Sequence, residues 1–392
     1  MRTDVFITDG HWRKSLAAVR ALGREGLSVT VGESTRIATA VFSRYCRHSV
    51  VYPSPLSQPE KFIDALEYEL SRHPCRMVLP MEDETTGLVS QHRSRLSKYA
   101  YIPVVSHEKY RLASRKDAVL KIAREIGIPV PETWFIDDPS RIDRIKDSLP
   151  YPVVIKPRVG SGAVGIVYSN NADELTAHYL NVCRRFPNPL IQERLPQEGP
   201  GYGVSLLFDE KGTVKASFVH KRLREYPVTG GASTFRESTR HDEIRDMAVA
   251  LMKKLEWFGV AMVEFKIDHR DGTPRLMEIN PRFWGSLHLS IIAGVNFPCL
   301  LYRLSKGETF DPVERYTLGV RCRWMLPGDI LHFIYNRRRA SLIPDFFNFT
   351  DRNTSYDILS LSDPMPVLGR LMTPLTFLYD PDMKRRLKKR KL

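Results

Sequence analysis

The sequence has few cysteines and no long apolar run, and both shortages narrow the class of protein. Its five cysteines (Cys46, Cys75, Cys183, Cys299 and Cys322) include no CxxC pair, which argues against a zinc site and for reduced thiols. No stretch of about 18 apolar residues exists, so no membrane-spanning helix is expected. The first residues, MRTDVFITDG, lead directly into an expected strand without a signal-peptide pattern. These features predict a cytoplasmic protein.

Two common nucleotide-binding motifs are also missing. The turn after the first expected strand, Thr8-Asp9-Gly10-His11, lacks the GxGxxG pattern that places a dinucleotide on a helix N-terminus, which disfavours a Rossmann oxidoreductase. The glycine-rich stretch RVGSGAVGI follows Lys156 and returns into a strand, whereas a Walker P-loop opens a helix. Any nucleotide must therefore be held in another way.

The 45 Asp and Glu residues are outnumbered by 59 Lys and Arg, and the net charge of +14 resembles a nucleic-acid signal until it is localised. The last nine residues, KRRLKKRKL, hold seven Lys or Arg and no acid, which is half of the net charge. Such a tail is most often a solvated end, but the apolar stretch PVLGRLMTPLTFL before it suits peripheral contact with an anionic membrane. No nucleic-acid partner is expected, because the tail lacks interleaved aromatic residues.

Residues 1 to about 105 alternate expected strands and helices, which predicts a parallel sheet covered by helices. Helical spacing is clearest in WRKSLAAVRALGREG, and strands are expected at DVFITDG, LSVTVGES, HSVVYP, CRMVLPME and YIPVVS. Ligands gather at the carboxyl ends of such strands, so the Glu82-Asp83 pair after LPM is a candidate substrate contact. A helix cap or a surface acid is the alternative for each residue.

The stretch from Gly259 to Arg282 predicts a β-hairpin that turns at Arg270-Asp271-Gly272. In this register Glu264 lies opposite Glu278 and shares its face with Asn280, while Met277 belongs to the opposite, apolar face. Like charges repel when they face each other across two strands, so a cation is expected between them. A hard divalent metal with oxygen ligands fits best, and a solvated hairpin face is the alternative.

Two further segments suit phosphate and anion binding. The glycine-rich turn with Gly160, Ser161 and Gly162 follows Lys156, so that backbone N–H groups and an ammonium group can approach phosphate oxygens. The segment HKRLREYPVTGGAST (220–234) predicts a flexible basic loop with a double glycine, suited to closing over an anionic substrate. Taken alone, such segments are more often an unliganded hairpin and a solvated loop.

In order and spacing, Lys116, VVIKPRVGSGAVGI, LIQERL, VEF and LMEINPR resemble the ATP-grasp superfamily. The resemblance runs from the first strand to about Gly307 and is nearest to carboxylate–amine ligase-like proteins related to the carbamoyl-phosphate synthase large chain. It implies an α/β (α+β) architecture with an N-terminal parallel-sheet pre-ATP-grasp domain (1–113) and an ATP-grasp domain of two α+β subdomains (114–307). Residues 308–392 form an unassigned C-terminal extension, in which Tyr316–Leu326 is expected to add a strand to a sheet.

The resemblance also implies residue roles. ATP would contact Lys116, Lys156, the turn at Gly160, Ser161 and Gly162, and an adenine pocket at Gln192, Glu193 and Leu195. Mg²⁺, or Mn²⁺ in its place, would be held by Glu264, Glu278 and Asn280. Arg282 would stabilise the acyl phosphate or its tetrahedral adduct, and Lys221, Arg222 and Arg224 would meet the carboxylate. Glu82 or Asp83 would hold the ammonium group of the acceptor, and Gly230 and Gly231 would lie beside the substrate. One departure is Gly201, which stands where many members carry an acid for the ribose, and Glu198 is the nearest substitute.

These roles imply an ATP-dependent ligase that activates a small-molecule carboxylate as an acyl phosphate, releases ADP, and joins the carboxylate to an amine. Two alternatives remain open at this point. One is a ligase that modifies a protein or peptide terminus, and the other is a non-catalytic nucleotide-binding module at a membrane. The sequence leaves a homodimer open and does not name either substrate.

Overall fold

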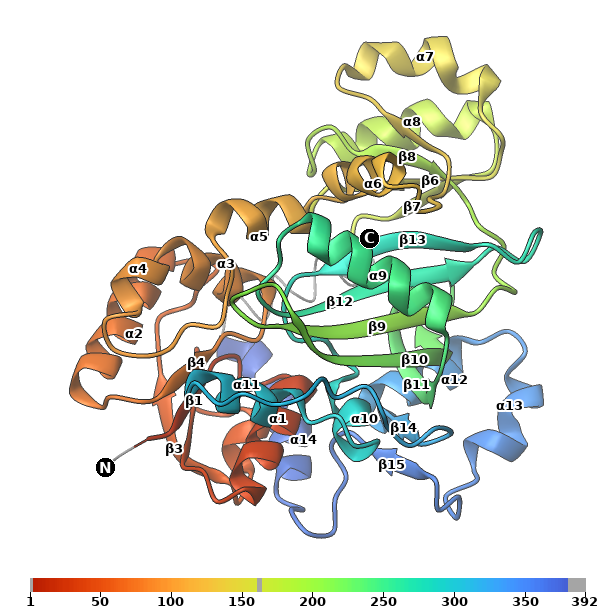
Figure 1. Ribbon diagram of the computed structural model, residues 1–392. Coiled ribbons are helices and arrows are strands. Elements are labelled where there is room, and N and C mark those ends of the chain that lie inside the picture. The colour runs from red at the N-terminus through yellow and green to blue at the C-terminus, as the bar shows by residue number, and fades with distance from the viewer. Residues whose placement is uncertain (1–2, 161–163, 380–392) are drawn as a thin grey trace.

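A computed structural model describes residues 3–160 and 164–379 of the chain. The N-terminal part is a parallel four-stranded sheet of order β3-β2-β1-β4, covered by helices (Figure 1). Its elements are β1 (Val5–Ile7), α1 (Arg13–Arg24), β2 (Val29–Glu33), η1 (Thr39–Phe42), β3 (Cys46–Val51), α2 (Pro59–Arg72), β4 (Met77–Leu79), α3 (Asp83–Gln91) and α4 (Arg93–Leu96). The expected strand YIPVVS is reduced to a bridge between Tyr101 and Met77.

Two helices then lead to a small antiparallel sheet of order β5-β8-β6-β7. Its apolar face packs on α7 and α8 around Tyr179 and Ile191, which are fully buried. The elements are α5 (His107–Ser114), α6 (Lys116–Glu125), β5 (Thr133–Phe135), η2 (Pro139–Arg141), α7 (Ile142–Ile145), η3 (Lys146–Ser148), β6 (Val153–Lys156), β7 (Val167–Ser169), α8 (Ala172–Cys183) and β8 (Leu190–Glu193). This small sheet is the first of the two α+β subdomains that the resemblance implies.

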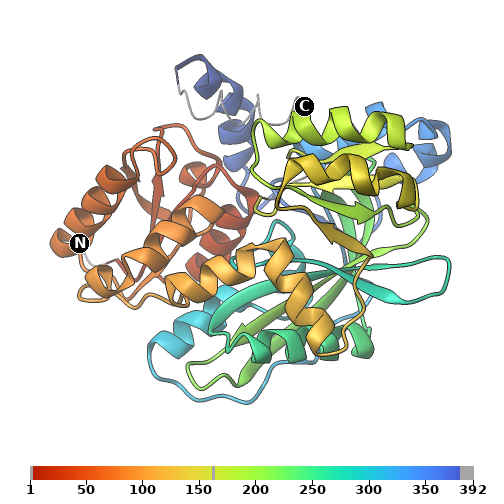
Figure 2. The same cartoon turned by 90° about the horizontal axis from the view of Figure 1, so that it is seen from above.

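The second subdomain is built on a seven-stranded sheet of order β13-β12-β9-β10-β11-β14-β15. Its elements are β9 (Gly201–Phe208), β10 (Val214–Tyr226), β11 (Ala232–Thr239), α9 (Asp242–Lys254), β12 (Gly259–Ile267), β13 (Pro274–Asn280), α10 (Leu287–Ile292) and α11 (Phe297–Ser305). One face packs on α6 and α9, and the other shares a core with α1 and the N-terminal sheet. The central sheet and the N-terminal part therefore form one packed body, with the small sheet above them (Figures 1 and 2).

The C-terminal region completes this sheet rather than forming a core of its own. It contributes β14 (Arg321–Arg323), η4 (Met325–Asp329), α12 (Ile330–Tyr335), α13 (Arg339–Phe346), β15 (Thr354–Tyr356) and α14 (Pro366–Tyr379). The strand expected within Tyr316–Leu326 is confirmed as β14, which pairs with β11. Cys322, Trp324 and Ile358 enter the core shared with α1. All five cysteines are free.

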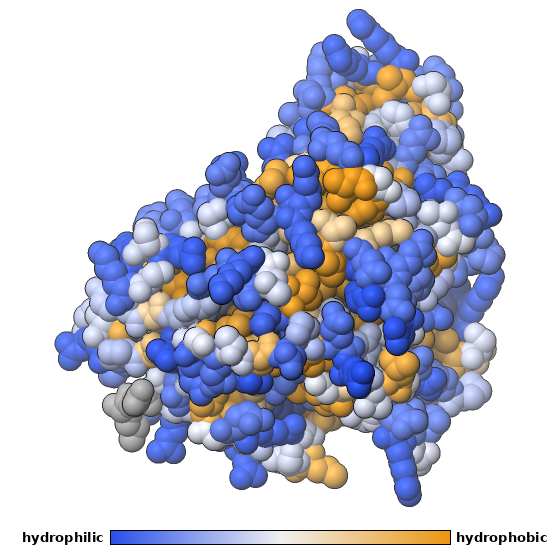
Figure 3. Space-filling model, in the orientation of Figure 1, coloured by the Kyte–Doolittle hydropathy of each residue, from blue (hydrophilic) through white to orange (hydrophobic). Residues whose placement is uncertain are grey.

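Polar side chains dominate the face shown in Figure 3, with apolar side chains visible between α6 and α9. Within the described ranges, no helix combines the length and the apolar character that a membrane crossing requires.

Candidate active site

One cleft of about 1490 Å³ lies between the N-terminal part, the two sheets and the C-terminal region. Every predicted site residue that the structure describes contributes to its wall, with the exception of Gln192. Ser161 and Gly162 lie outside the described residues, so the structure does not place them. The fold thus brings candidate site residues that are distant in the sequence to one cleft, and the contacts of each residue indicate its role.

The two glutamates face each other as the hairpin register predicts. Glu264 pairs with Glu278 across β12 and β13, and the Asn280 side-chain amide donates to Glu264 Oε1 at 3.0 Å. A bulge follows this pair, so Phe265 pairs with Leu276. The prediction that Met277 joins the apolar face is wrong, because the bulge lets Met277 line the cleft while Leu276 fills the core.

Cations from two other elements meet these glutamates. Lys116 Nζ at the start of α6 lies 3.0 Å from Glu278 Oε2 and donates to the Gly160 carbonyl oxygen at 2.6 Å. The guanidinium of Arg222, on β10, forms an ion pair with Glu264. The first lysine, the glycine turn and the hairpin acids therefore converge on one point, although they are up to 162 residues apart in the sequence.

The charges are strongly perturbed by burial and by one another. Burial raises the pKa of Glu264, Glu278 adds to the rise, and Arg222 opposes it. Burial also acts to raise the pKa of Glu278, but the ammonium groups of Lys116 and Lys156 bring it below its usual value. Burial lowers the pKa of Lys156 to about 8, with the Glu278 carboxylate opposing the fall. Opposed shifts within one cluster are typical of functional sites.

Gln192 serves as a support behind the cleft wall. Its side chain is 1% exposed, accepts from Lys156 Nζ at 2.7 Å and donates to Thr133 Oγ1 at 2.9 Å. Because β6 and β8 are neighbours in the small sheet, Gln192 can fix the ammonium group of Lys156. The Gln192 side chain is thus engaged behind the cleft wall, and a contribution of Gln192 to the adenine pocket stays a prediction for its backbone groups.

Glu193 and Leu195 do line the cleft. The Glu193 carboxylate accepts from the Glu132 backbone N–H at 2.8 Å and from Arg270 Nη2 at 2.8 Å. Its oxygens are thus already engaged, which leaves backbone groups and Leu195 as the natural base contacts. At Gly201, an added Cβ would lie 3.2 Å from Arg222 Cδ, and Glu198 lies on the cleft wall nearby.

Of the three cations predicted to bind the carboxylate, Arg222 pairs with Glu264, whereas Arg224 and Lys221 do not. Arg224 is 6% exposed and pairs with Asp329 at 2.8 Å and with Asp345 at 2.5 Å, so acids of the C-terminal region neutralise its charge. Lys221 precedes Arg222 in β10 and also lines the cleft. Of these three cations, Arg222 is the one that pairs with Glu264, and the substrate contacts of Lys221 and Arg224 stay a prediction.

The expected flexible loop at 220–234 is mostly strand. β10 continues to Tyr226 and β11 starts at Ala232, so that Gly230 and Gly231 lie at the tip of a hairpin. A Cβ on Gly231 would lie 2.2 Å from the Tyr226 carbonyl oxygen, which explains the glycine. Tyr168 of the small sheet donates to the Thr229 carbonyl oxygen at 2.9 Å, so this tip bridges the cleft.

The predicted acceptor-binding acids are both paired with cations. Glu82 lies 2.6 Å from Lys14 Nζ, and Asp83 accepts from Arg282 Nε and Nη2 at 2.7 and 3.0 Å. The Asp83–Arg282 pair joins the N-terminal part to the end of β13. All three side chains line the cleft while they make these ion pairs, and their contacts with substrate groups stay a prediction.

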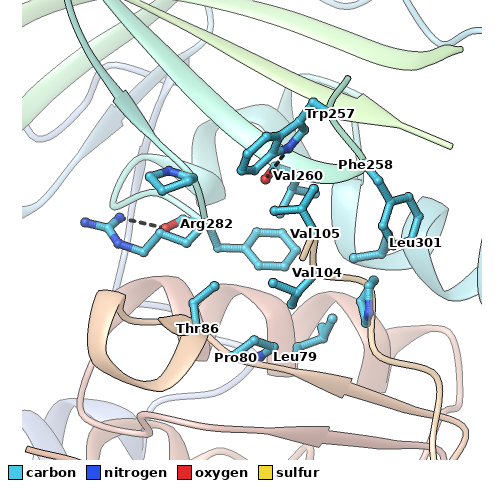
Figure 4. Close-up of a pocket in the computed structure, with 13 residues that line it drawn as sticks. Leu79, Pro80, Thr86, Val104, Val105, Trp257, Phe258, Val260, Arg282 and Leu301 are labelled. Atoms are coloured by element: carbon cyan, nitrogen blue, oxygen red, sulfur yellow. Dashed lines mark hydrogen bonds between the residues drawn. The ribbon is translucent and has the colours of Figure 1, made fainter. Parts of the chain in front are cut away.

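A second, much smaller cavity lies behind Arg282, in the interface between the N-terminal part and the central sheet (Figure 4). Its volume is about 20 Å³, and apolar residues such as Leu79, Val105 and Trp257 line it. The Arg282 guanidinium turns away from it and donates to the Phe283 carbonyl oxygen at 2.8 Å. A space of this size holds no more than about one water molecule, so it is a packing defect of the interface.

Sequence reasoning missed several residues on the far wall of the cleft. Arg13 donates to the Gly285 carbonyl oxygen at 2.6 Å, and its guanidinium stacks over the Trp324 ring at 3.8 Å. His220 Nε2 lies 3.3 Å from Ser286 Oγ, while its Nδ1 is buried without a partner among the described residues. Arg13 follows the first strand closely, so the strand-end rule that selected Glu82 could have found it.

A family model described as ATP-grasp in the biosynthetic pathway with Ter operon matches residues 185–326. The biotin carboxylase of Campylobacter jejuni superimposes with a TM-score of 0.67 at 15% identity, covering 81% of this chain and 74% of that one. The chain therefore has the ATP-grasp fold, with a parallel-sheet domain before it.

The sequence relatives include a ligase and a carbamoyl phosphate synthase. D-aspartate ligase of Enterococcus faecium is 22% identical over 236 residues, 56% of each chain. The C-terminal section of the carbamoyl phosphate synthase large chain of Methanopyrus kandleri is 23% identical over 177 residues, covering 43% of this chain and 32% of the relative. The alignments thus span about half or less of these relatives. Residues 185–326 thus match an ATP-grasp family, the structure has the ATP-grasp fold, and the chain is similar in sequence to a D-aspartate ligase and to the carbamoyl phosphate synthase large chain.

Proposed function

We propose that the protein is an ATP-dependent ligase that activates a carboxylate as an acyl phosphate and joins it to an amine. The observation that carries this proposal is the position of Lys116 Nζ, which contacts both the Gly160 carbonyl oxygen and the Glu278 carboxylate. A triphosphate needs an ammonium group, a glycine turn and metal-binding carboxylates at one place, and Lys116 marks where they meet.

The donors on the hairpin fit a magnesium ion. Glu264, Glu278 and Asn280 offer only oxygen ligands of the type that Mg²⁺ prefers, and the facing glutamates already attract Lys116 and Arg222. Within the described part of the chain, no group of three or more His, Cys, Asp or Glu is suited to a metal, so phosphate oxygens would complete the shell. A bound magnesium ion would neutralise charge on the β- and γ-phosphates.

The chain's own residues would act by position and charge rather than by covalent catalysis. Lys116 and Lys156 would hold the phosphates, with Gln192 fixing Lys156 from behind. A substrate carboxylate oxygen would attack the γ-phosphorus in line while ADP leaves, forming the acyl phosphate. The amine would then attack the acyl carbon, and inorganic phosphate would leave. Arg222 is the cation best placed to hold the carboxylate, because it lies beside Glu264 on the cleft wall.

The relatives support this reaction class without naming the substrates. The D-aspartate ligase is by its name a ligase of an amino acid, and it aligns with 56% of this chain. Amino acids and hydroxy acids are therefore the first substrates to examine. Their identity would be set by cleft residues outside the phosphate site, such as Arg13, His220 and Trp324.

The test is ATP turnover to ADP and phosphate across a panel of amino acids and hydroxy acids, with magnesium present. Glu278→Gln should lower turnover by about a hundredfold or more, because it removes one metal-binding charge. Glu243→Gln, on the exposed side of α9, is the matched control and should leave turnover unchanged. Release of AMP and pyrophosphate, or full activity of the Glu278→Gln variant, would refute the proposal.

A further inference from the structure

In helix α14 the apolar side chains lie on the outer side and the small or polar ones face the protein, which is the reverse of an ordinary surface helix. The side that faces the protein carries small or polar residues, and Gly369, Thr373 and Thr376 are buried. The outer side carries large apolar residues, which are between 42% and 63% exposed: Met365 just before the helix, then Leu368, Leu371 and Leu375. These residues recur at the three- or four-residue spacing of one helix face.

The inward side of α14 is fixed by close packing, so the helix cannot simply rotate to bury its leucines. It lies against η1, and a Cβ on Gly369 would come within 2.6 Å of Phe42 Cδ2. Thr373 and Thr376 satisfy their hydroxyl groups by donating to the Gly369 and Thr373 carbonyl oxygens, at 3.0 and 2.6 Å. Because the glycine and threonines pack closely against η1, the orientation of α14 is fixed, and its leucines must face outward.

The segment before the helix anchors it firmly. The Asp363 side chain is 1% exposed and accepts from Arg20 Nε at 2.8 Å, Ser43 Oγ at 2.7 Å and the Arg44 backbone N–H at 2.9 Å. All three donors belong to the N-terminal part. The apolar face of α14 is thus presented by a rigid support, at the outer edge of the molecule in Figure 2, where α14 is the dark blue helix.

We propose that the outer face of α14 binds an anionic lipid surface. The sequence after the helix contains Asp380 and Asp382 and then seven Lys or Arg between positions 384 and 392, so its net charge is positive. An apolar helix face beside such a segment matches the two components of peripheral membrane binding. A second copy of the chain fits less well, because pairing two α14 faces would bring two of these cationic segments together.

The helix lies along the membrane rather than across it. Its 14 residues extend about 21 Å, which is shorter than the roughly 30 Å of a hydrocarbon core, and its inner side is occupied by η1. Leu368, Leu371 and Leu375 would enter the boundary between headgroups and acyl chains. Because α14 packs on the N-terminal part, that part of the protein would lie next to the membrane.

The experiment is flotation of the full-length protein with vesicles of phosphatidylcholine alone or with about one third phosphatidylserine. The wild type should bind the anionic vesicles at least about tenfold better, and added salt should weaken binding. A triple variant, Leu368→Ser, Leu371→Ser and Leu375→Ser, should lower binding at least about tenfold. Leu318→Ser is the matched control, because Leu318 is 54% exposed away from α14, and it should bind like the wild type.

Three outcomes would overturn the proposal. The first is absence of binding to either vesicle by the wild type, and the second is binding that survives the triple substitution, which would assign it to the cationic segment alone. The third is a dimer in light scattering that the triple variant converts to a monomer without any vesicle binding, which would make a second copy the occupant. The substituted leucines are exposed, so unchanged thermal unfolding of the triple variant verifies its fold.

Discussion

The buried ammonium group of Lys156 should make the use of ATP sensitive to alkaline pH. Burial lowers its pKa from the ordinary 10.5 to about 8, while Glu278 and Lys116 act in opposite directions. Only the charged form attracts phosphate. With a pKa of about 8, the ammonium is about nine tenths charged at pH 7 and about one tenth charged at pH 9. We therefore expect kcat/KM for ATP to fall about tenfold between these values.

The fall in kcat/KM at high pH reflects the pKa of Lys156 in the enzyme without bound ATP. kcat/KM reports ionisations before ATP binds, whereas bound phosphates stabilise the ammonium, so kcat at saturating ATP should fall less. Lys14 has its pKa lowered by burial to about 8 as well, so a fall alone would not identify the group. Lys156→Arg separates them, because a guanidinium keeps its charge in this range. The variant should lose the alkaline fall even if its activity is lower.

The assay is a pH series of initial rates at limiting ATP, from pH 6.5 to about 9.5, for both proteins. A flat profile for the wild type would show that Lys156 does not titrate in this range. An identical fall in Lys156→Arg would assign the titration to another group and refute the reasoning.

Two further predictions concern ion pairs that hold the cleft together. Asp83→Asn removes the charge that receives two hydrogen bonds from Arg282, and we expect it to lower the free energy of unfolding by about 1–3 kcal/mol in denaturant titrations; an unchanged midpoint would contradict this. Asp329→Asn should cost more, about 3–5 kcal/mol, because it leaves the buried Arg224 and Arg323 without their shared carboxylate. A loss below about 1 kcal/mol would show that other groups compensate.

Much of the fold could be predicted from local pattern. The periodicity of WRKSLAAVRALGREG gives α1 within one or two residues, and the alternation around Glu264 and Glu278 gives the register of β12 and β13. The bulge beside Glu264 could not be seen, because a bulge depends on packing against the neighbouring β9 as well as on the hairpin itself. The length of β10 was missed for a related reason, since its pairing with β11 draws the charged stretch HKRLREY, which was expected to be loop, into a strand.

The sequence predicted which residues lie in the candidate site better than it predicted the contacts that they make. Sequence spacing selects Lys116, Lys156 and Glu278, which do lie in one cleft. It could not show that Arg224 is neutralised by Asp329, because that acid comes 105 residues later from a region outside the resemblance. Nor could it show that Asp83 holds Arg282. Long-range ion pairs are set by tertiary structure, and a single sequence carries no record of them.

The carboxylates of the C-terminal region have a consequence for how the protein is made. Arg20, on α1, is 1% exposed and meets Asp363, which is 343 residues further along the chain. At a synthesis rate of about 5–20 residues per second, the helix leaves the ribosome on the order of half a minute before its partner. Until then the Arg20 guanidinium lacks the C-terminal groups that cover and neutralise it, so the N-terminal part cannot reach its final packing alone. A chain stopped at residue 307 would remain in that state permanently, and expression of the first three quarters should give a poorly folded product.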